Sequence, residues 1–184
     1  MNSVYEQIRK ICEETASRDP VGILEILMDL PECPMHGPIH HYLVGAALLT
    51  AYRNSGGAID LSWALKELEG RASCVPGAVC GLWGACGACI STGQYLSIVT
   101  GSGPLAEEPW GTCIGMTAKA LTALAEVGGP RCCKRDSYLS VLTAVDYTAE
   151  NIGIQMEKKQ PVCSRSHRNA QCIADRCPFH GGKV

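Results

Sequence analysis

The chain has 184 residues, which is enough for one domain with a sizeable hydrophobic core and short for two. Its formal net charge of −2 gives no electrostatic preference for nucleic acid or for a membrane surface. No apolar run reaches the roughly 18 residues of a membrane-spanning helix, and the first residues, MNSVYEQIRK, lack the apolar stretch of a signal peptide. We therefore expect a cytoplasmic protein that binds neither nucleic acid nor a membrane.

Cysteine is the exception in an otherwise ordinary composition, with 12 in the chain. A secreted disulfide scaffold is normally shorter and follows a signal peptide. In the cytoplasm thiols stay reduced, so grouped cysteines there indicate a metal site or catalysis. With a single Phe and 5% aromatic residues, the core is expected to consist of small aliphatic side chains and sulfur.

Apolar residues recur at helical spacing in several segments that turn residues separate. Asp19-Pro20, Asp60 and Asp136 are typical helix starts, because an Asp side chain caps free amides and proline fits the first helical position. The predicted helices cover residues 3–16, 20–30, 39–53, 61–70, 110–127 and 137–152. In the helix that follows Asp60, Trp63, Leu65 and Leu68 are expected to face the core.

Residues 78–99 are unusually rich in glycine and alanine. Each glycine disfavours a helix by about 1 kcal/mol relative to alanine. The segment can therefore form one long buried helix or two pieces that break near 84–87. Glycines at 77, 81, 84, 87 and 93 indicate either another helix packed very closely or a backbone that wraps a cofactor.

Residues 157–184 are polar and show no helical periodicity. With almost no strand pattern elsewhere, we predict an all-α protein: a single globular domain of about seven helices with an irregular Cys-bearing C-terminal tail. The helical domain would cover 1–156, and the tail, 157–184, would pack on the same domain. The Ala- and Gly-rich faces could also form contacts between subunits, so a homo-oligomer stays open.

A proline-rich loop before the third helix carries Cys33 and His36 and leads into His40 and His41. A positive charge is unfavourable at a helix N-terminus, so His40 and His41 should stay neutral. Neutral imidazole is the form that binds metals and acts as a general base. His36 and His40 are therefore candidates for acid/base catalysis, with a hydrogen-bonded structural role as the alternative for each.

Cys86 and Cys89 form a C-x2-C pair, which lets two thiolates reach one metal or cluster. Cys80 lies nearby in the same glycine-rich stretch. The alternative is helical packing, because residues three apart share one face of a helix and cysteine is a good small core residue.

Cys132 and Cys133 are adjacent, so their side chains diverge and rarely bind one atom. Arg131, Lys134 and Arg135 surround the pair, and a helix begins nearby. Positive charge and a helix N-terminus both lower a thiol pKa. The setting indicates a reactive thiolate, with Cys133 as a candidate nucleophile, or a ligand for an anionic cluster. The alternative is one buried and one exposed cysteine beside a solvated basic loop.

The tail has the pattern Cys163-x8-Cys172-x4-Cys177-Pro178. Proline after the last cysteine is common in iron–sulfur sequences. His167 and His180 could make the tail a zinc site instead. A polar segment without a hydrophobic face needs a cross-link to be ordered, and a metal provides one in a reducing cell.

Four motifs span most of the chain: CPMHGPIHH at 33–41, VPGAVCGLWGACGA at 75–88, GGPRCCKR at 128–135 and C-x4-CPF at 172–179. They resemble an uncharacterised cysteine-rich domain of unknown function in anaerobic archaea and bacteria. The resemblance implies an anaerobic setting and fusion, in some relatives, to methyltransferase or radical-SAM-type domains. Cys89 stands where many relatives have alanine, and Cys12, Cys74 and Cys113 lie outside the motifs, which favours packing roles.

Our first hypothesis is a [4Fe–4S] protein with ligands from Cys86, from Cys132 or Cys133, and from Cys172 and Cys177. Three ligands would leave one iron open for lyase or sulfur-transfer chemistry on a small-molecule or sulfur-donor substrate. The alternatives are a non-enzymatic zinc module and a metal-free thiol redox or sulfur-carrier protein that uses the adjacent pair. The candidate metal ligands are Cys33, Cys80, Cys86, Cys89, Cys132, Cys133, Cys163, Cys172 and Cys177.

Overall fold

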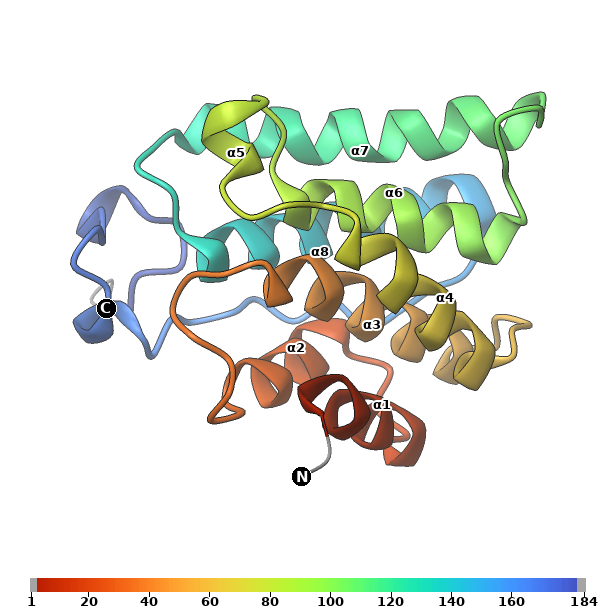
Figure 1. The fold of residues 1–184 in the computed structure, drawn as a ribbon, viewed down its shortest axis with the longest axis horizontal. Coiled ribbons are helices and arrows are strands. Elements are labelled where there is room, and N and C mark those ends of the chain that lie inside the picture. The colour runs from red at the N-terminus through yellow and green to blue at the C-terminus, as the bar shows by residue number, and fades with distance from the viewer. Residues whose placement is uncertain (1–2, 182–184) are drawn as a thin grey trace.

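The computed structural model describes residues 3–181 and confirms the all-α prediction (Figure 1). No strand occurs in that part of the chain. An isolated β-bridge joins Cys163 to His180 there. The α-helices are α1 Val4–Glu14, α2 Pro20–Met28, α3 Ile39–Asn54, α4 Leu61–Ser73, α5 Val79–Leu82, α6 Gly87–Thr100, α7 Glu108–Val127 and α8 Cys133–Ile152, and the tail has two 3-10 turns, η1 Ser166–Arg168 and η2 Ala174–Arg176.

Several helix starts follow from local chemistry. Ser3 and Glu6 form a capping box at the start of α1. Asp19 accepts the amide of Val21 ahead of Pro20, and Asp60 accepts the amide of Trp63. These caps satisfy amides that have no partner within the helix, which fixes where α1, α2 and α4 begin.

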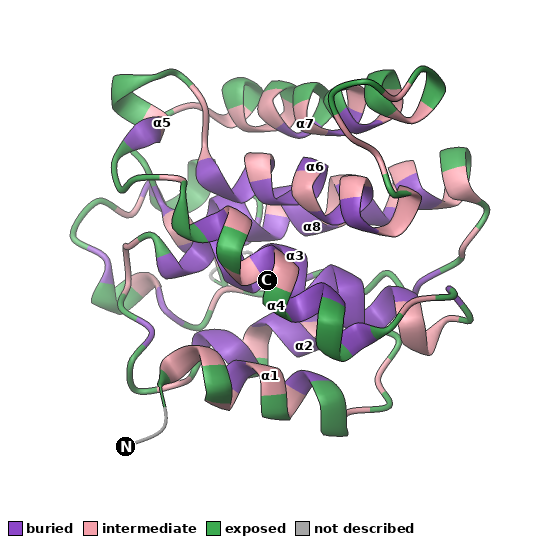
Figure 2. Cartoon of the chain, turned by 45° about the vertical axis from the view of Figure 1, so that its right-hand side comes forward, coloured by how far each residue is buried: buried purple, intermediate pink, exposed green. Residues whose placement is uncertain are grey.

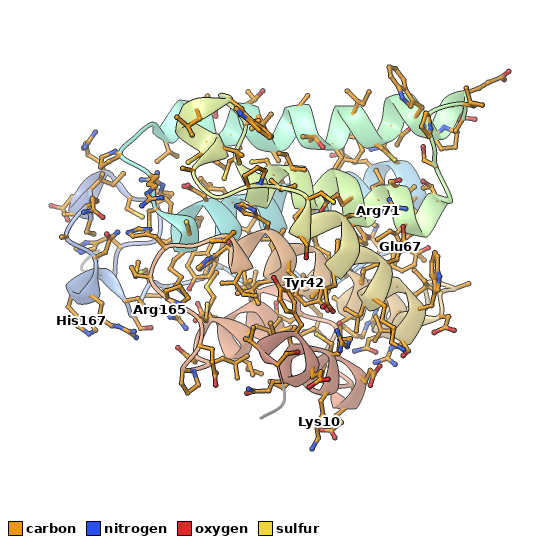
Figure 3. All side chains as sticks on the ribbon, viewed as in Figure 1. Lys10, Tyr42, Glu67, Arg71, Arg165 and His167 are labelled. Carbon is orange, nitrogen blue, oxygen red and sulfur yellow. The ribbon has the colours of Figure 1, made fainter. Side chains whose placement is uncertain are left out.

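Helix α3 is the centre of the fold. Its residues from Ile39 to Tyr52 are all buried, and it packs against α2, α4, α6 and α8 (Figure 2). A Cβ at Gly45 would come within 2.9 Å of the Ser91 hydroxyl in α6 and closer still to Leu68 in α4. Only glycine therefore lets these three helices approach so closely. Figure 3 shows Tyr42 inside the bundle and Lys10 at its surface.

The glycine-rich segment forms two pieces, α5 and α6, with a break at 83–86. Close packing of helices explains part of its glycine content, because a Cβ at Gly93 would meet the Thr117 hydroxyl of α7 at 2.1 Å. Gly84 instead adopts a positive φ of 68°, which ends α5 in a turn that other residues disfavour.

Two local predictions are wrong. Trp63 is 53% exposed and does not face the core, whereas Leu65 and Leu68 are fully buried. Helix α8 begins at Cys133, with Cys132 as its N-cap, so Asp136 lies inside the first turn instead of capping it. This earlier start places the adjacent cysteines at the helix N-terminus.

The tail packs against the end of the bundle where α3, α6 and α8 begin (Figure 1). Arg165, labelled in Figure 3, is 3% exposed. It pairs with Glu25 of α2 at 2.6 Å and with Asp29, the C-cap of that helix, at 2.5 Å. Phe179 packs edge-on against Tyr138 of α8, with ring centroids 5.3 Å apart. Long-range ion pairing and aromatic packing thus hold a segment with little regular structure. Among the described residues, no helix has the length and apolar character needed to cross a membrane.

Candidate functional site

Two cavities meet at the N-terminus of α8. Cys132 lines one of them, here called the first cavity, and Cys133 lines the other, the second cavity. Adjacent side chains at a helix start point in different directions, so one dipeptide contributes a thiol to each cavity.

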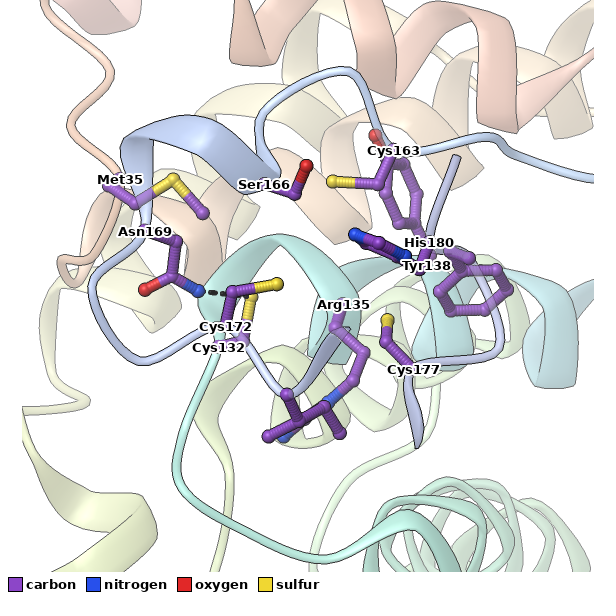
Figure 4. Close-up of a pocket in the computed structure, with 12 residues that line it drawn as sticks. Met35, Cys132, Arg135, Tyr138, Cys163, Ser166, Asn169, Cys172, Cys177 and His180 are labelled. Carbon is purple, nitrogen blue, oxygen red and sulfur yellow. Dashed lines mark hydrogen bonds between the residues drawn. The ribbon is translucent and has the colours of Figure 1, made fainter. Parts of the chain in front are cut away.

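Four cysteines line the first cavity, a small and partly enclosed space of about 20 Å³ (Figure 4). Cys132 comes from α8, and Cys163, Cys172 and Cys177 come from the tail. The structure thus brings the three tail cysteines to one of the two adjacent cysteines. The thiols surround the cavity rather than converge on one point: no group of three His, Cys, Asp or Glu side chains within residues 3–181 is arranged to hold a single metal ion.

Tight backbone turns present the tail thiols. The amide of Cys163 donates to the carbonyl of Phe179 at 2.7 Å, which joins the two ends of the tail. Turn η2 lies between Cys172 and Cys177, and Ala174 within it has a left-handed φ of 47°. The Cys177 amide donates to the Ala174 carbonyl at 2.8 Å. This loop brings two cysteines five positions apart to the same cavity.

Hydrogen-bond donors face the sulfur atoms. The amide of Ala174 donates to Cys172 Sγ at 3.4 Å, and Asn169 Nδ2 donates to Cys132 Sγ at 3.5 Å. His36 Nε2 donates in turn to Asn169 Oδ1 at 3.1 Å. Donors of this kind stabilise thiolates and tune the metal groups that thiolates bind. His36 Nδ1 is buried and has no hydrogen-bond partner among the described residues.

Arg135 brings a buried positive charge to the first cavity. Its side chain is 5% exposed, with Nε 3.1 Å from Asp136 Oδ1 and Nη2 3.0 Å from the carbonyl of Pro130. Its Nη1 is buried without a partner in the part of the chain that the structure describes. A buried donor of this kind suits an anionic occupant, because an unsatisfied guanidinium nitrogen is costly.

The adjacent thiols are not acidified as the sequence predicted. Burial raises the pKa of Cys132 to about 11, although the nearby backbone amides of Arg135 and Lys134 act in the opposite direction. Burial also raises the pKa of Cys133. The alternative of a solvated basic loop does not hold for Lys134 and Arg135, which are 2% and 5% exposed. A metal would therefore have to displace a proton from Cys132 on binding.

The second cavity has a volume of about 90 Å³, and the N-termini of α3, α6 and α8 meet at it. Cys133 is joined there by Cys86, the N-cap of α6, and by Cys80 of α5. His36, His40, His41, Arg131 and Asp136 complete the titratable groups of its lining. Cys86, expected beside the tail cysteines, thus lies at this cavity and not at the first.

His40 and His41 are neutral, as predicted, but burial is the main cause. It lowers the pKa of His40 to about 3, with the charge of Lys134 acting in the same direction. It lowers the pKa of His41 as well. Each Nδ1 lies near a backbone carbonyl, that of Gly37 at 2.9 Å for His40 and that of Val75 at 3.2 Å for His41. The carbonyls fix the proton on Nδ1 and leave Nε2 as an acceptor.

Two further candidates line neither cavity. Cys33 is buried between Lys134 Nζ at 3.2 Å and His40 Nε2 at 3.9 Å. Cys89 is fully buried in α6, with its sulfur 3.5 Å from the Ser140 hydroxyl. Of the cysteines expected to pack, Cys12 and Cys113 are buried and Cys74 is exposed.

Comparison with protein families gives one match. Residues 8–180 fit the profile of DUF5714, a family of unknown function. The chain belongs to the DUF5714 family. No curated protein and no solved structure matches it.

One residue that bonds to a thiol of the first cavity in this DUF5714 chain was not predicted as part of a site. Asn169 is an ordinary polar residue of an irregular segment, and its sulfur partner lies 37 positions away, so nothing local marks it. Arg135 was predicted beside the adjacent cysteines as a source of positive charge, but its burial was not. Its position after two cysteines, three residues into a helix, could have indicated a side chain directed along the first turn.

Proposed function

We propose that this chain is an iron–sulfur protein that binds one [4Fe–4S] cluster in the first cavity through Cys132, Cys163, Cys172 and Cys177. The observation that carries the proposal is the convergence of four cysteines from α8 and the tail on one partly enclosed cavity. A [4Fe–4S] cluster takes one cysteine for each of its four irons, so its ligands are spaced around the cluster. A zinc ion needs its ligands within bonding distance of a single atom.

The surroundings of the cavity support a cluster. Cys132 and Cys177 are 8% and 7% exposed, which restricts the access of water and oxidants. The amide and side-chain donors to sulfur are those that adjust cluster potentials. The free Nη1 of Arg135 supplies positive charge next to a group of negative charge. When bound through four cysteines, such a cluster supplies one-electron transfer.

The proposed setting is an anaerobic cytoplasm, as the motif resemblance implies. An electron-transfer role is compatible with a methyltransferase or radical-SAM-type partner, because radical chemistry on S-adenosylmethionine consumes single electrons. If one of the four cysteines does not bind iron, the open iron would instead allow lyase or sulfur-transfer chemistry.

The test is anaerobic purification followed by assays of iron, acid-labile sulfide and zinc, with an electron paramagnetic resonance spectrum after reduction. We expect about four iron and four sulfide per chain. Substituting any one of Cys132, Cys163, Cys172 or Cys177 by Ser should remove most of both. Cys86→Ser, in the second cavity, and Cys74→Ser, at the surface, are matched controls that should retain them.

A colourless protein with zinc and no sulfide would contradict the proposal and favour the zinc module. Full iron content in exactly one of the four ligand variants would indicate the open-iron form. Loss of iron in Cys86→Ser with retention in Cys163→Ser would show that the cluster lies at the other cavity.

A further inference from the structure

Cys33 and Lys134 form a buried pair that lines neither of the two cavities. Lys134 Nζ donates to Cys33 Sγ at 3.2 Å, and this bond joins the loop between α2 and α3 to the first turn of α8. The two residues are 2% and 5% exposed. His40, which is 1% exposed, places its Nε2 3.9 Å from the same sulfur. A thiol thus lies in contact with a primary amine inside the protein.

The sulfur of Cys33 is the partner that offsets the lysine charge. Lysine is almost never fully buried without a group of opposite charge, because an unpaired buried ammonium is costly. The other acceptor of Lys134 Nζ is the carbonyl of Met28, at 3.4 Å. No carboxylate forms an ion pair with Lys134 among residues 3–181. A thiolate at Cys33 balances the ammonium better than a thiol does, and the thiolate is the reactive form of cysteine.

The contacts of Cys33 favour a reaction with nitrogen over a reaction with a second thiol. An oxidised cysteine, the sulfenic acid, condenses with a nearby thiol or with a nitrogen atom. The hydrogen-bond partners of Cys33 Sγ within residues 3–181 are Lys134, His40 and the carbonyl of Pro34, so none of them is a thiol. The lysine nitrogen is already in contact with the sulfur and needs little movement to bond to it.

The position of Cys33 admits small molecules only. Its chain neighbours Glu32 and Pro34 are exposed, whereas Cys33 itself is 5% exposed. The sulfur therefore lies just beneath the surface, within reach of a molecule close to the size of water. Hydrogen peroxide is of that size, and glutathione is much larger.

We infer that Cys33 and Lys134 are an oxidation site, at which a small hydroperoxide closes a covalent S–N cross-link between the two side chains. The link would tie the loop between α2 and α3 to the start of α8, the segment that carries Cys132 and Cys133. This goes beyond the cluster proposal and does not depend on it, since neither residue of the pair lines the first cavity.

The reaction balances in two steps. The Cys33 thiolate attacks one oxygen of hydrogen peroxide, the O–O bond breaks, and the hydroxide that leaves takes a proton from the Lys134 ammonium to become water. The Lys134 amine then attacks the sulfur of the sulfenic acid, the S–O bond breaks, and the second hydroxide leaves with a proton from the nitrogen as water. The pair loses two electrons and two protons, and the peroxide is reduced to two molecules of water.

The test treats the anaerobically isolated full chain with a small excess of hydrogen peroxide. The remaining thiols are alkylated, and the chain is digested with trypsin for peptide mass spectrometry. We expect a linked pair of peptides that joins Cys33 to Lys134, with a mass two hydrogen atoms below their sum and no cleavage after Lys134. Dithiothreitol should restore both separate peptides. Cumene hydroperoxide, a bulky oxidant, should form the link more slowly than hydrogen peroxide.

Three variants sharpen this result. Lys134→Arg retains the positive charge but lacks the primary amine, so Cys33 should stop at the sulfenic acid, which dimedone traps. Cys33→Ser should leave Lys134 unmodified and open to trypsin. Cys89→Ser is the matched control, because it removes another buried cysteine, one whose sulfur lies 3.5 Å from the Ser140 hydroxyl, and it should retain the link.

A free Lys134 beside a Cys33 oxidised to the sulfinic acid would overturn the assignment. So would a link from either residue to a different side chain, or a Cys33 that stays reduced while the exposed Cys74 is fully oxidised. The peptides of the unmodified sequence decide these outcomes, so a variant that fails to fold leaves the test intact. Iron content is measured in the same samples, so failure of the cross-link and failure of the cluster are separate outcomes.

Discussion

Arg135 is the side chain with which charge at the first cavity can be varied most directly. It is held on two of its nitrogens by Asp136 and Pro130, so its position does not depend on an occupant of the cavity. A fixed positive charge stabilises the reduced form of a cluster, which carries one more electron. In a site this buried the effect is little screened by solvent.

We therefore predict that Arg135→Gln lowers the cluster reduction potential by about 50 mV or more, in line with a unit charge several ångströms away in a protein interior. Arg135→Lys should give a smaller change. Redox titration followed by electron paramagnetic resonance measures both. Arg131→Gln removes an exposed charge and is the matched control. An unchanged potential in a glutamine variant that retains its iron would contradict the role given to the guanidinium.

At the level of helices, α6 and α3 are in contact through Gly87 and His41. This contact fixes the start of α6, which carries Cys86, against the central helix. We predict that Gly87→Ala destabilises the protein by about 1–3 kcal/mol, because the added Cβ overlaps the His41 ring. The measurement is the free energy of unfolding from urea titration.

Gly70→Ala is the control for that substitution. Gly70 lies within α4, and a Cβ there would meet nothing within 4 Å. The same change should stabilise the protein by about 0.5–1 kcal/mol through helix propensity. Equal effects of the two substitutions would show that the contact with His41 does not constrain α6.

Helix positions could be predicted from the sequence where capping residues mark them. Asp19 and Asp60 begin helices as expected, and the break in the glycine-rich segment was one of two stated alternatives. The start of α8 was misplaced because Asp136 has the chemistry of a cap while Cys132 does not. Trp63 was wrongly predicted to face the core. Its hydrophobicity does not indicate which side of α4 the neighbouring helices cover.

At the level of the whole molecule, the tail is joined to the bundle by side-chain contacts and has little regular structure. Arg165 with Glu25, Asn169 with His36 and Phe179 with Tyr138 are among these links, and the tail contains two short 3-10 turns. Thiolate ligation would supply the additional cross-link that a polar segment needs.

We predict that removing the cluster with a chelator and an oxidant, followed by thiol reduction, exposes the tail to trypsin. Cleavage after Arg168 and Arg176, which lie between the proposed ligands, should accelerate about tenfold or more. Far-UV circular dichroism should change little, because helices α1 to α4 and α6 to α8 contact one another directly. Arg18, between the first two helices, is the reference site. Equal tail cleavage with and without the cluster would mean that its other contacts suffice to order it.

The candidate sites were predictable in kind but not in composition. Cysteine grouping indicated thiol chemistry and drew attention to Cys132, Cys133 and the tail. The division of these residues between two cavities depends on the path of the tail around α2 and α8, which long-range pairs such as Arg165 with Glu25 determine. No local pattern encodes a contact between positions 140 residues apart.

The order of the proposed ligands along the chain has a consequence for biosynthesis. All four lie after residue 131, and the last is Cys177 of 184 residues. Domains begin to fold from the N-terminus while the ribosome is still adding roughly 5–20 residues per second. Helices α1 to α7 are therefore synthesised before a single ligand is made. Delivery of a cluster with all four ligands must wait until residue 177 has been translated, and a chain shortened by a premature stop before residue 163 would fold most of its helices yet retain only Cys132 of the four.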